Sequence, residues 1–129
     1  MSRPLISEAE SSVMEAIWAE GPLGAKDLLA RLGAARGWGE ATVRTLIHRL
    51  IKKHALRSER RGAEAAYVAL VRREDYVTAQ SQDLLDRLFD GKLTALVEHL
   101  SREQRLEPAD VARLRRLVAQ LDADEEAEG

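Results

Sequence analysis

The chain has 129 residues, 45% of them hydrophobic, which suffices for one compact domain or for a small domain with an appendage, but not for two large cores. It contains no cysteine, so disulfides, thiolate metal sites and cysteine nucleophiles are excluded. The net charge of −2 hides an asymmetry, because residues 1–71 carry 11 Lys and Arg against 8 Asp and Glu, whereas residues 72–129 carry 9 against 14.

Two helices are predicted at the start of the chain. Ser7 and Glu10 fit the Ser-x-x-Glu pattern of a capping box, and the apolar residues that follow recur at helical spacing, so a helix is expected over residues 8–19. A second, shorter helix is expected over residues 25–32. The segment "GAARGWG", with its three glycines, is expected to end it.

A third helix is predicted over residues 40–54, and it has the strongest periodicity in the chain. Its apolar residues recur at the spacing of one buried stripe. They are Val43, Leu46, Ile47, Leu50 and Ile51.

A β-hairpin is expected after the third helix, with strands over residues 56–61 and 65–71 and a turn at residues 62–64. Tyr67, Val68 and Val71 favour strands, whereas the alanines of this segment are poor strand formers.

Three amphipathic helices are predicted in the second half, over residues 74–89, 92–100 and 108–121, with Pro108 suited to a first turn. The final segment, "DADEEAEG", has little to bury and is expected to be an acidic, disordered tail. The predicted fold is therefore mainly α with a small β-hairpin. Residues 1–72 are expected to form a winged helix-turn-helix domain, residues 73–121 a helical region, and residues 122–129 the tail.

Positive charge gathers in residues 39–62, which hold seven Lys or Arg against two Glu. Three helices and a hairpin are the element order of a winged helix, in which the third helix enters the major groove. Opposite the apolar stripe of that helix lie small residues, a hydroxyl, a histidine and flanking cations, which suit a groove lined by phosphates. We expect base contacts from Arg44, Thr45 and His48. Phosphate contacts are expected from Thr42, Arg49, Lys52, Lys53, Arg60 and Arg61.

Two segments, "ISEAESSVMEAIW" and "WGEATVRTLIHRLIKKHAL", resemble the BlaI/MecI penicillinase and methicillin-resistance repressors, a family grouped with the copper-responsive CopY repressors. The resemblance covers about residues 5–121 and includes the core pattern T-[VI]-x-T-L-[IL]-x-R-L-x-x-K and the segment "LFDGKLTALV". It implies a winged-helix repressor that binds a palindromic operator as a homodimer.

The resemblance also implies dimerisation through the C-terminal helices, whose apolar stripes exceed what so small a domain can cover. The same stripes allow an alternative, in which these helices fold back on the N-terminal domain. The residues expected at the dimer interface are Leu84, Leu88, Leu93, Leu96, Val97, Leu100, Val111, Leu114, Leu117, Val118 and Leu121.

In the family that this chain resembles, signalling usually runs through a membrane-bound metallopeptidase sensor. The repressor is then inactivated by cleavage at an Asn-Phe pair in its C-terminal region. This sequence has "ALVEHLS" there, so His99 and Leu100 occupy the expected cleavage region. The cysteine-rich motif of the copper branch is absent, which excludes copper sensing by thiolates.

Other functions lack the residues that they need. The three histidines do not fall at ligand spacing with carboxylates, so no metal or cofactor is expected. No phosphate loop, nucleophile elbow or His-Glu-x-x-His motif is present, so an enzyme is not expected. No apolar run reaches the length of a signal peptide or a membrane span, and a cytoplasmic location is expected. The alternative function is a winged-helix module that docks an acidic protein partner without specific DNA binding.

Overall fold

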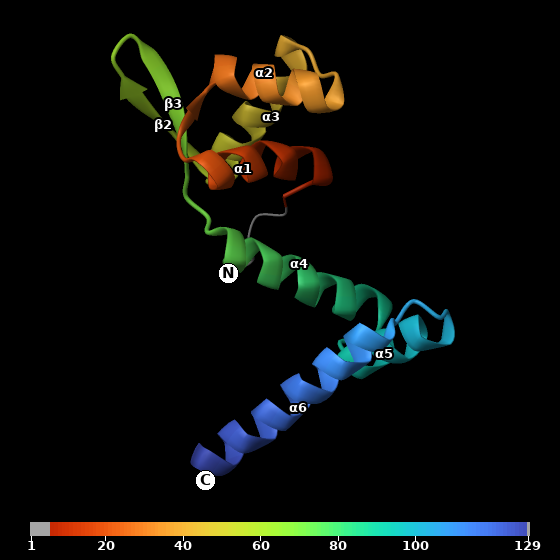
Figure 1. The fold of residues 1–129 in the computed structure, drawn as a ribbon. Helices are drawn as coiled ribbons and strands as arrows, with labels where there is room; N and C mark the ends of the chain where they lie inside the picture. The colour runs from red at the N-terminus through yellow and green to blue at the C-terminus, as the bar shows by residue number, and fades with distance from the viewer. Residues whose placement is uncertain (1–5, 129) are drawn as a thin grey trace. The chain divides into compact units, whose positions relative to one another are not determined.

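The computed structural model describes residues 6–128 and divides them into two compact units, one ending at Gln80 and the other beginning at Ser81 (Figure 1). Residues 1–5 of the predicted first domain and residue 129 of the predicted tail lie outside the described residues. The predicted fold class is confirmed, since the elements are mostly helices with one small sheet. In chain order they are α1 (Glu8–Glu20), β1 (Leu23–Gly24), α2 (Ala25–Arg36), α3 (Glu40–Lys52), β2 (Leu56–Arg61), β3 (Glu64–Ala69), α4 (Arg73–Leu88), α5 (Leu93–Arg102) and α6 (Pro108–Glu128).

The capping box at the start of α1 is confirmed. The Ser7 hydroxyl accepts a hydrogen bond from the Glu10 backbone N–H at 3.1 Å, and the Glu10 carboxylate accepts one from the Ser7 N–H at 2.8 Å. Two N–H groups that a helix start leaves unpaired are thus satisfied, which fixes where α1 begins.

Helix α2 extends one turn beyond the predicted end at residue 32. It runs through Gly33 and ends before Gly37, whose φ of 71° is the left-handed conformation that glycine adopts at helix ends. An interior glycine costs a helix only about 1 kcal/mol relative to alanine. In the added turn, Arg36 lies 3.6 Å from the Glu8 carboxylate and 4.5 Å from the Trp38 ring centre, and these contacts help to offset that cost, so Gly33 does not end the helix as predicted.

The sheet has the strand order β1-β3-β2, with both pairings antiparallel. The predicted hairpin is confirmed, although β3 begins one residue earlier than expected and ends at Ala69. The two-residue strand β1 was not predicted, because a strand so short has no periodicity to detect. A Cβ on Gly24 would lie 3.1 Å from the Ala65 carbonyl oxygen, so the absent side chain allows β1 to approach β3.

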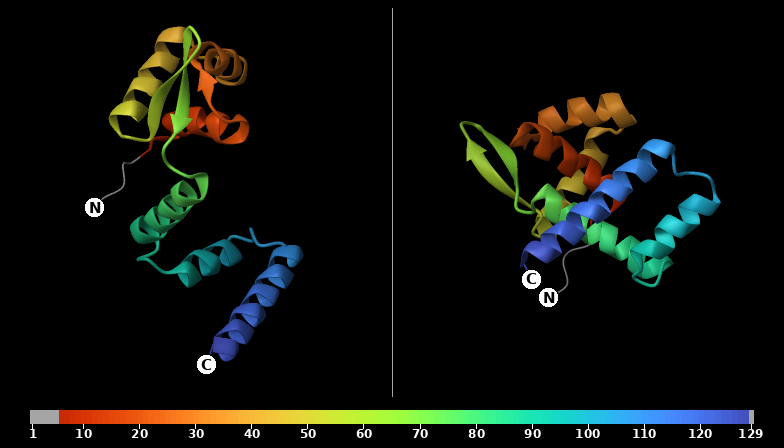
Figure 2. Two further views of the ribbon diagram at one scale, coloured as in Figure 1. Left: turned by 90° about the vertical axis from the view of Figure 1, so that its left-hand side faces the viewer. Right: turned by 60° about the horizontal axis from the view of Figure 1, so that its bottom comes forward.

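The core of the first unit lies between α1, α2, α3 and the sheet, as two further views show (Figure 2). Four of the five predicted stripe residues of α3 are buried, and Ile51 packs against them half-buried. This burial fixes which face of α3 points outward. The core residues are Ile6, Val13, Met14, Ile17, Leu23, Leu28, Leu32, Val43, Leu46, Ile47, Leu50, Ala55 and Leu56.

The beginning of α4 belongs to the first unit. The Trp18 indole N–H donates to the Val71 carbonyl oxygen at 2.8 Å, and its ring lies 5.4 Å from that of Tyr76. Arg73 adds an ion pair with Glu15 at 2.9 Å. The predicted boundary after residue 72 therefore lies ahead of the division at Gln80, because the first turns of α4 are tied to α1.

The second unit contains the rest of α4 together with α5 and α6, and among residues 81–128 none is fully buried. Helix α6 continues to Glu128, so residues 122–128 are helical, contrary to the predicted disordered tail. The alanines and glutamates of this segment are compatible with a helix even though their side chains are exposed. None of the described helices is both long and apolar enough to span a membrane.

Candidate nucleic-acid interface

The outward face of α3 carries the residues expected to contact bases. Arg44, Thr45 and His48 are exposed, as are Thr42, Arg49 and Lys52 around them. The Thr45 hydroxyl donates to the Ala41 carbonyl oxygen at 2.9 Å, so its lone pairs remain available to accept a hydrogen bond. The structure therefore brings six of the nine predicted DNA-binding residues together on one rigid helix.

The hairpin supplies the next two predicted residues, Arg60 and Arg61, near its tip. Both are exposed, and they point to opposite faces of the ribbon because successive strand side chains alternate. Figure 1 shows the β2–β3 hairpin projecting beyond the three helices of its unit. Arg61 makes a 3.4 Å ion pair with Glu59 of the same strand, and Arg57 is exposed on that strand.

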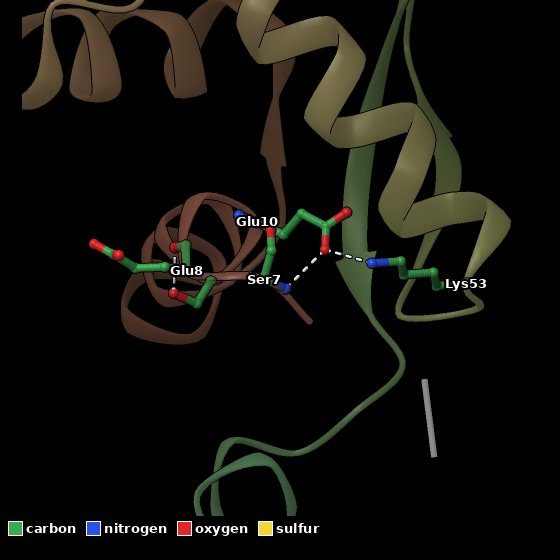
Figure 3. Close-up of polar contacts among 5 residues, drawn as sticks. Ser7, Glu8, Glu10 and Lys53 are labelled. Atoms are coloured by element: carbon green, nitrogen blue, oxygen red, sulfur yellow. Dashed lines mark hydrogen bonds and ion pairs between the residues drawn. The ribbon is translucent and has the colours of Figure 1, made fainter. Parts of the chain in front are cut away.

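The ninth predicted residue, Lys53, has a different environment. Its ammonium contacts the Glu10 carboxylate at 2.6 Å, and Figure 3 shows this carboxylate between Lys53 and the Ser7 backbone N–H. Although burial raises the pKa of the Glu10 carboxyl, the hydrogen bonds from Lys53 and Ser7 outweigh it and hold this pKa below its ordinary value. The ion pair ties the end of α3 to the start of α1, and a phosphate contact by Lys53 stays a prediction.

Sequence reasoning missed Glu10 as a partner for α3, although a signal was present. Glu10 precedes Val13 by three residues and Met14 by four, so it lies on the buried stripe of α1. A carboxylate on such a stripe is expected to have a cationic partner. Which cation it would be could not be read, because Lys53 is 43 residues away.

A second missed group lies where α2, α3 and the sheet meet. Lys26 makes a 3.4 Å ion pair with Glu64, and Arg44 makes one at 2.9 Å with Glu40. Lys26 and Arg44 together line two shallow pockets of about 170 and 210 Å³, of which Glu40 lines the first and Glu64 the second. The α3 face is thus bordered by two carboxylates from different elements.

The two tryptophans and His54 have structural positions in the first unit. Trp18 and Trp38 are half-buried against the core, and the Arg36 guanidinium lies 4.5 Å from the Trp38 ring centre. His54 follows α3 with a left-handed φ of 63°. Within residues 6–128, no three His, Asp or Glu side chains are grouped so that they could hold a metal ion.

The predicted dimerisation residues lie on α4, α5 and α6, and most of them are exposed. The exposed fraction reaches 62% at Leu88 and 66% at Leu121, whereas Leu96, Val97, Leu100 and Leu114 are half-buried. His99 and Leu100, the expected cleavage region, lie inside α5, and the His99 ring is 6.0 Å from that of Phe89.

Comparison with known proteins extends over nearly the whole chain. The chain is 28% identical to a penicillinase repressor of Bacillus licheniformis over 89% of this chain and 90% of the relative. It is 27% identical to the methicillin resistance regulatory protein MecI of Mammaliicoccus sciuri over 88% and 92% of the two chains. The solution structure of the monomeric B. licheniformis BlaI in complex with the blaP half-operator matches with a TM-score of 0.53 and 32% identity, over 58% of this chain and 92% of that one. The sequence profile of the penicillinase repressors matches residues 6–120, and the chain therefore belongs to the penicillinase repressor family.

Proposed function

We propose that this chain is a transcriptional repressor that binds operator DNA through α3 and the β2–β3 wing. The observation that carries the proposal is the outward face of α3, where cations and hydroxyls stand on a helix fixed by its buried stripe. The related BlaI, bound to a half-operator in its solution structure, supports the assignment.

Each side chain has a role that suits its chemistry. Arg44, Thr45 and His48 contact base edges in the major groove, because a guanidinium, a hydroxyl and an imidazole can all pair with donors or acceptors there. Around this centre, cations and one hydroxyl contact the phosphates; the cations neutralise the DNA backbone, and all of these contacts set the register of the protein. These phosphate-binding residues are Thr42, Arg49, Lys52, Lys53, Arg60 and Arg61.

A second copy of the chain completes the proposed repressor. Residues 81–128 expose apolar side chains and bury none fully, so their helices gain stability when another apolar surface covers them. A homodimer formed there presents two copies of α3 to the half-sites of a palindromic operator.

Repression ends, in this proposal, when a metallopeptidase sensor cleaves the dimerising region near His99 and Leu100. Both residues lie within α5, and proteases act on extended chain, so cleavage requires local opening of this helix. Its half-buried apolar side chains offer little resistance to such opening.

The test is binding of the purified protein to its own upstream intergenic DNA and to a scrambled duplex over a series of salt concentrations. We expect tight, salt-dependent binding with a large preference for the upstream fragment. Lys52→Ala should weaken binding to both duplexes and flatten the salt slope by about one unit, whereas Arg44→Ala should reduce discrimination at one base pair. Equal, weak binding of the unaltered protein to both duplexes would contradict the proposal and favour a protein-interaction module.

A further inference from the structure

The base-contacting face of α3 begins with a carboxylate that contacts one of its arginines. The Arg44 Nε–H donates to Glu40 Oε1 at 2.9 Å, and the two residues are one helical turn apart. Both side chains are more than half exposed, so this contact stands in solvent at the edge of the face proposed to enter the groove.

The contact leaves Arg44 with the donors that a guanine needs. A guanidinium has five N–H groups, and Glu40 receives the one on Nε. The two terminal nitrogens can then donate together to O6 and N7 of a guanine, which is the commonest specific arginine contact in the major groove. The Glu40 carboxylate that accepts from Nε restricts rotation of the long Arg44 side chain, so Arg44 loses less conformational freedom when it binds DNA.

Helix stability explains a negative charge at this position but not its pairing with Arg44, because Glu40 stands in the first turn of α3, where the helix dipole favours a carboxylate. An exposed ion pair one turn apart on a helix contributes little to folding. In the groove, a negative charge is also repelled by the phosphates, and Glu64 adds a second carboxylate near Arg44, through the pocket that both line. The contact with Arg44 gives this carboxylate a specific effect, which is distinct from its general opposition to DNA binding.

We propose that Glu40 is a positioning residue, which holds the Arg44 guanidinium so that it selects guanine over the other bases at one operator position. The inference rests on the proposed DNA-binding function and on Arg44 as a base reader. Glu40 lowers affinity for DNA in general and raises the discrimination that Arg44 achieves.

The experiment measures the affinity of Glu40→Ala and Glu40→Gln for the operator, for the three operator variants at the base pair that Arg44→Ala identifies, and for a scrambled duplex. Glu40→Ala should reduce the preference for guanine about fivefold to tenfold and raise affinity for the scrambled duplex about twofold. Glu40→Gln keeps an oxygen acceptor without the charge, so it should retain part of the preference.

Asp83→Ala is the matched control. Asp83 pairs with Arg87 at 2.8 Å, also one turn apart on an exposed helical surface, so the variant removes the same charge and the same kind of contact from α4. It should leave the preference for guanine unchanged. In the Arg44→Ala background, Glu40→Ala should have no further effect on that preference, because the residue through which it acts is gone.

Two outcomes separate this inference from the function beneath it. If the unaltered protein prefers its operator but Glu40→Ala raises affinity for all duplexes by the same factor, the positioning role is wrong and the carboxylate acts only through its charge. If the unaltered protein does not prefer the operator, the proposed function has failed, and the positioning role fails with it.

Discussion

The two units of this chain place their apolar side chains differently. In the first, three helices and a sheet surround side chains that are almost wholly buried, among them Leu28 and Leu50 at 0% exposure. In the second, Leu88, Leu117 and Leu121 are more than half exposed. The first unit has its own core and holds α3 in a fixed orientation, whereas the second has apolar surface that its own helices do not cover. Stability of the first should therefore be independent of protein concentration, and that of the second should not.

The largest effect is expected from Leu50→Ala, which truncates a fully buried side chain on the inner face of α3. We expect the free energy of unfolding of the first unit to fall by about 2–5 kcal/mol, because the truncation leaves a cavity. Urea unfolding measured at two protein concentrations should give the same loss. Leu70→Ala, at a residue of the same unit that is 51% exposed, should cost less than about 0.5 kcal/mol, and equal losses for the two variants would contradict the role of Leu50 in the core of the first unit.

A lysine on the apolar face of α6 tests the second unit. Leu117→Lys should raise the dissociation constant of the proposed dimer more than tenfold, because it places a charge where apolar surface is to be covered. Sedimentation equilibrium measures this constant, and unfolding of the first unit should be unaffected. Ala112→Lys places the same charge on the opposite side of α6 and should leave association unchanged. A monomer that is insensitive to both changes would show that the exposed stripe has no second copy of the chain as its partner.

The next effect concerns the ion pair between Glu10, at the start of α1, and Lys53, at the end of α3. Lys53→Met removes the cation beside the buried Glu10 carboxylate and should lower the free energy of unfolding by about 1–3 kcal/mol. Lys52→Met, at the exposed neighbouring position, should change stability by less than about 0.5 kcal/mol while weakening DNA binding. Similar stability of the two variants would show that the 2.6 Å contact has no structural role.

Acid should weaken the same contact. The folded pKa of Glu10 lies below its ordinary value of 4.5, so ionised Glu10 stabilises the fold above that pH, and the stabilisation is lost as the pH falls through the folded pKa. Glu10→Gln lacks this contribution. Thermal melting between about pH 6 and about pH 3 should therefore show a smaller acid-induced loss in Glu10→Gln than in the unaltered protein. Parallel curves would contradict the depressed pKa.

The smallest effect should come from His54→Gly, which relieves backbone strain and removes the imidazole side chain. His54 has a φ of 63°, which glycine adopts at lower cost than a residue with a Cβ. We expect the free energy of unfolding to rise by up to about 1 kcal/mol, with the gain detectable as a higher urea midpoint. A lower midpoint would mean that the histidine side chain makes a contribution larger than the strain.

Sequence reasoning was accurate where a local pattern has one physical explanation. The capping box of Ser7 and Glu10 fixed the start of α1, and the stripe from Val43 to Ile51 gave both the helix and its outward face. It failed where the cause lies elsewhere in the chain. Strand β1 exists only because β3 pairs with it, and the turn of α2 past Gly33 carries Arg36, which pairs with Glu8 of α1.

The candidate site also has a part that local sequence patterns predict and a part that depends on distant segments. The cations of α3 and the wing are visible as a cluster in the sequence, and the structure brings most of them together. Glu40 and Glu59 are local partners of Arg44 and Arg61. Other carboxylates near these cations come from separate segments, as Glu10 beside Lys53 and Glu64 in a pocket that Arg44 also lines show. Only folding reveals which cations those carboxylates contact.

The contact between Glu10 and Lys53 also has a consequence for how sequences of this kind can diverge. A buried carboxylate without its cation is costly, so loss of Lys53 alone should be disfavoured during evolution, and so should the burial of another acid at position 53. Joint replacement by two apolar side chains removes both charges at once and avoids that cost. Positions 10 and 53 should therefore change together among related chains, as a coupled pair joining the first helix to the end of the third.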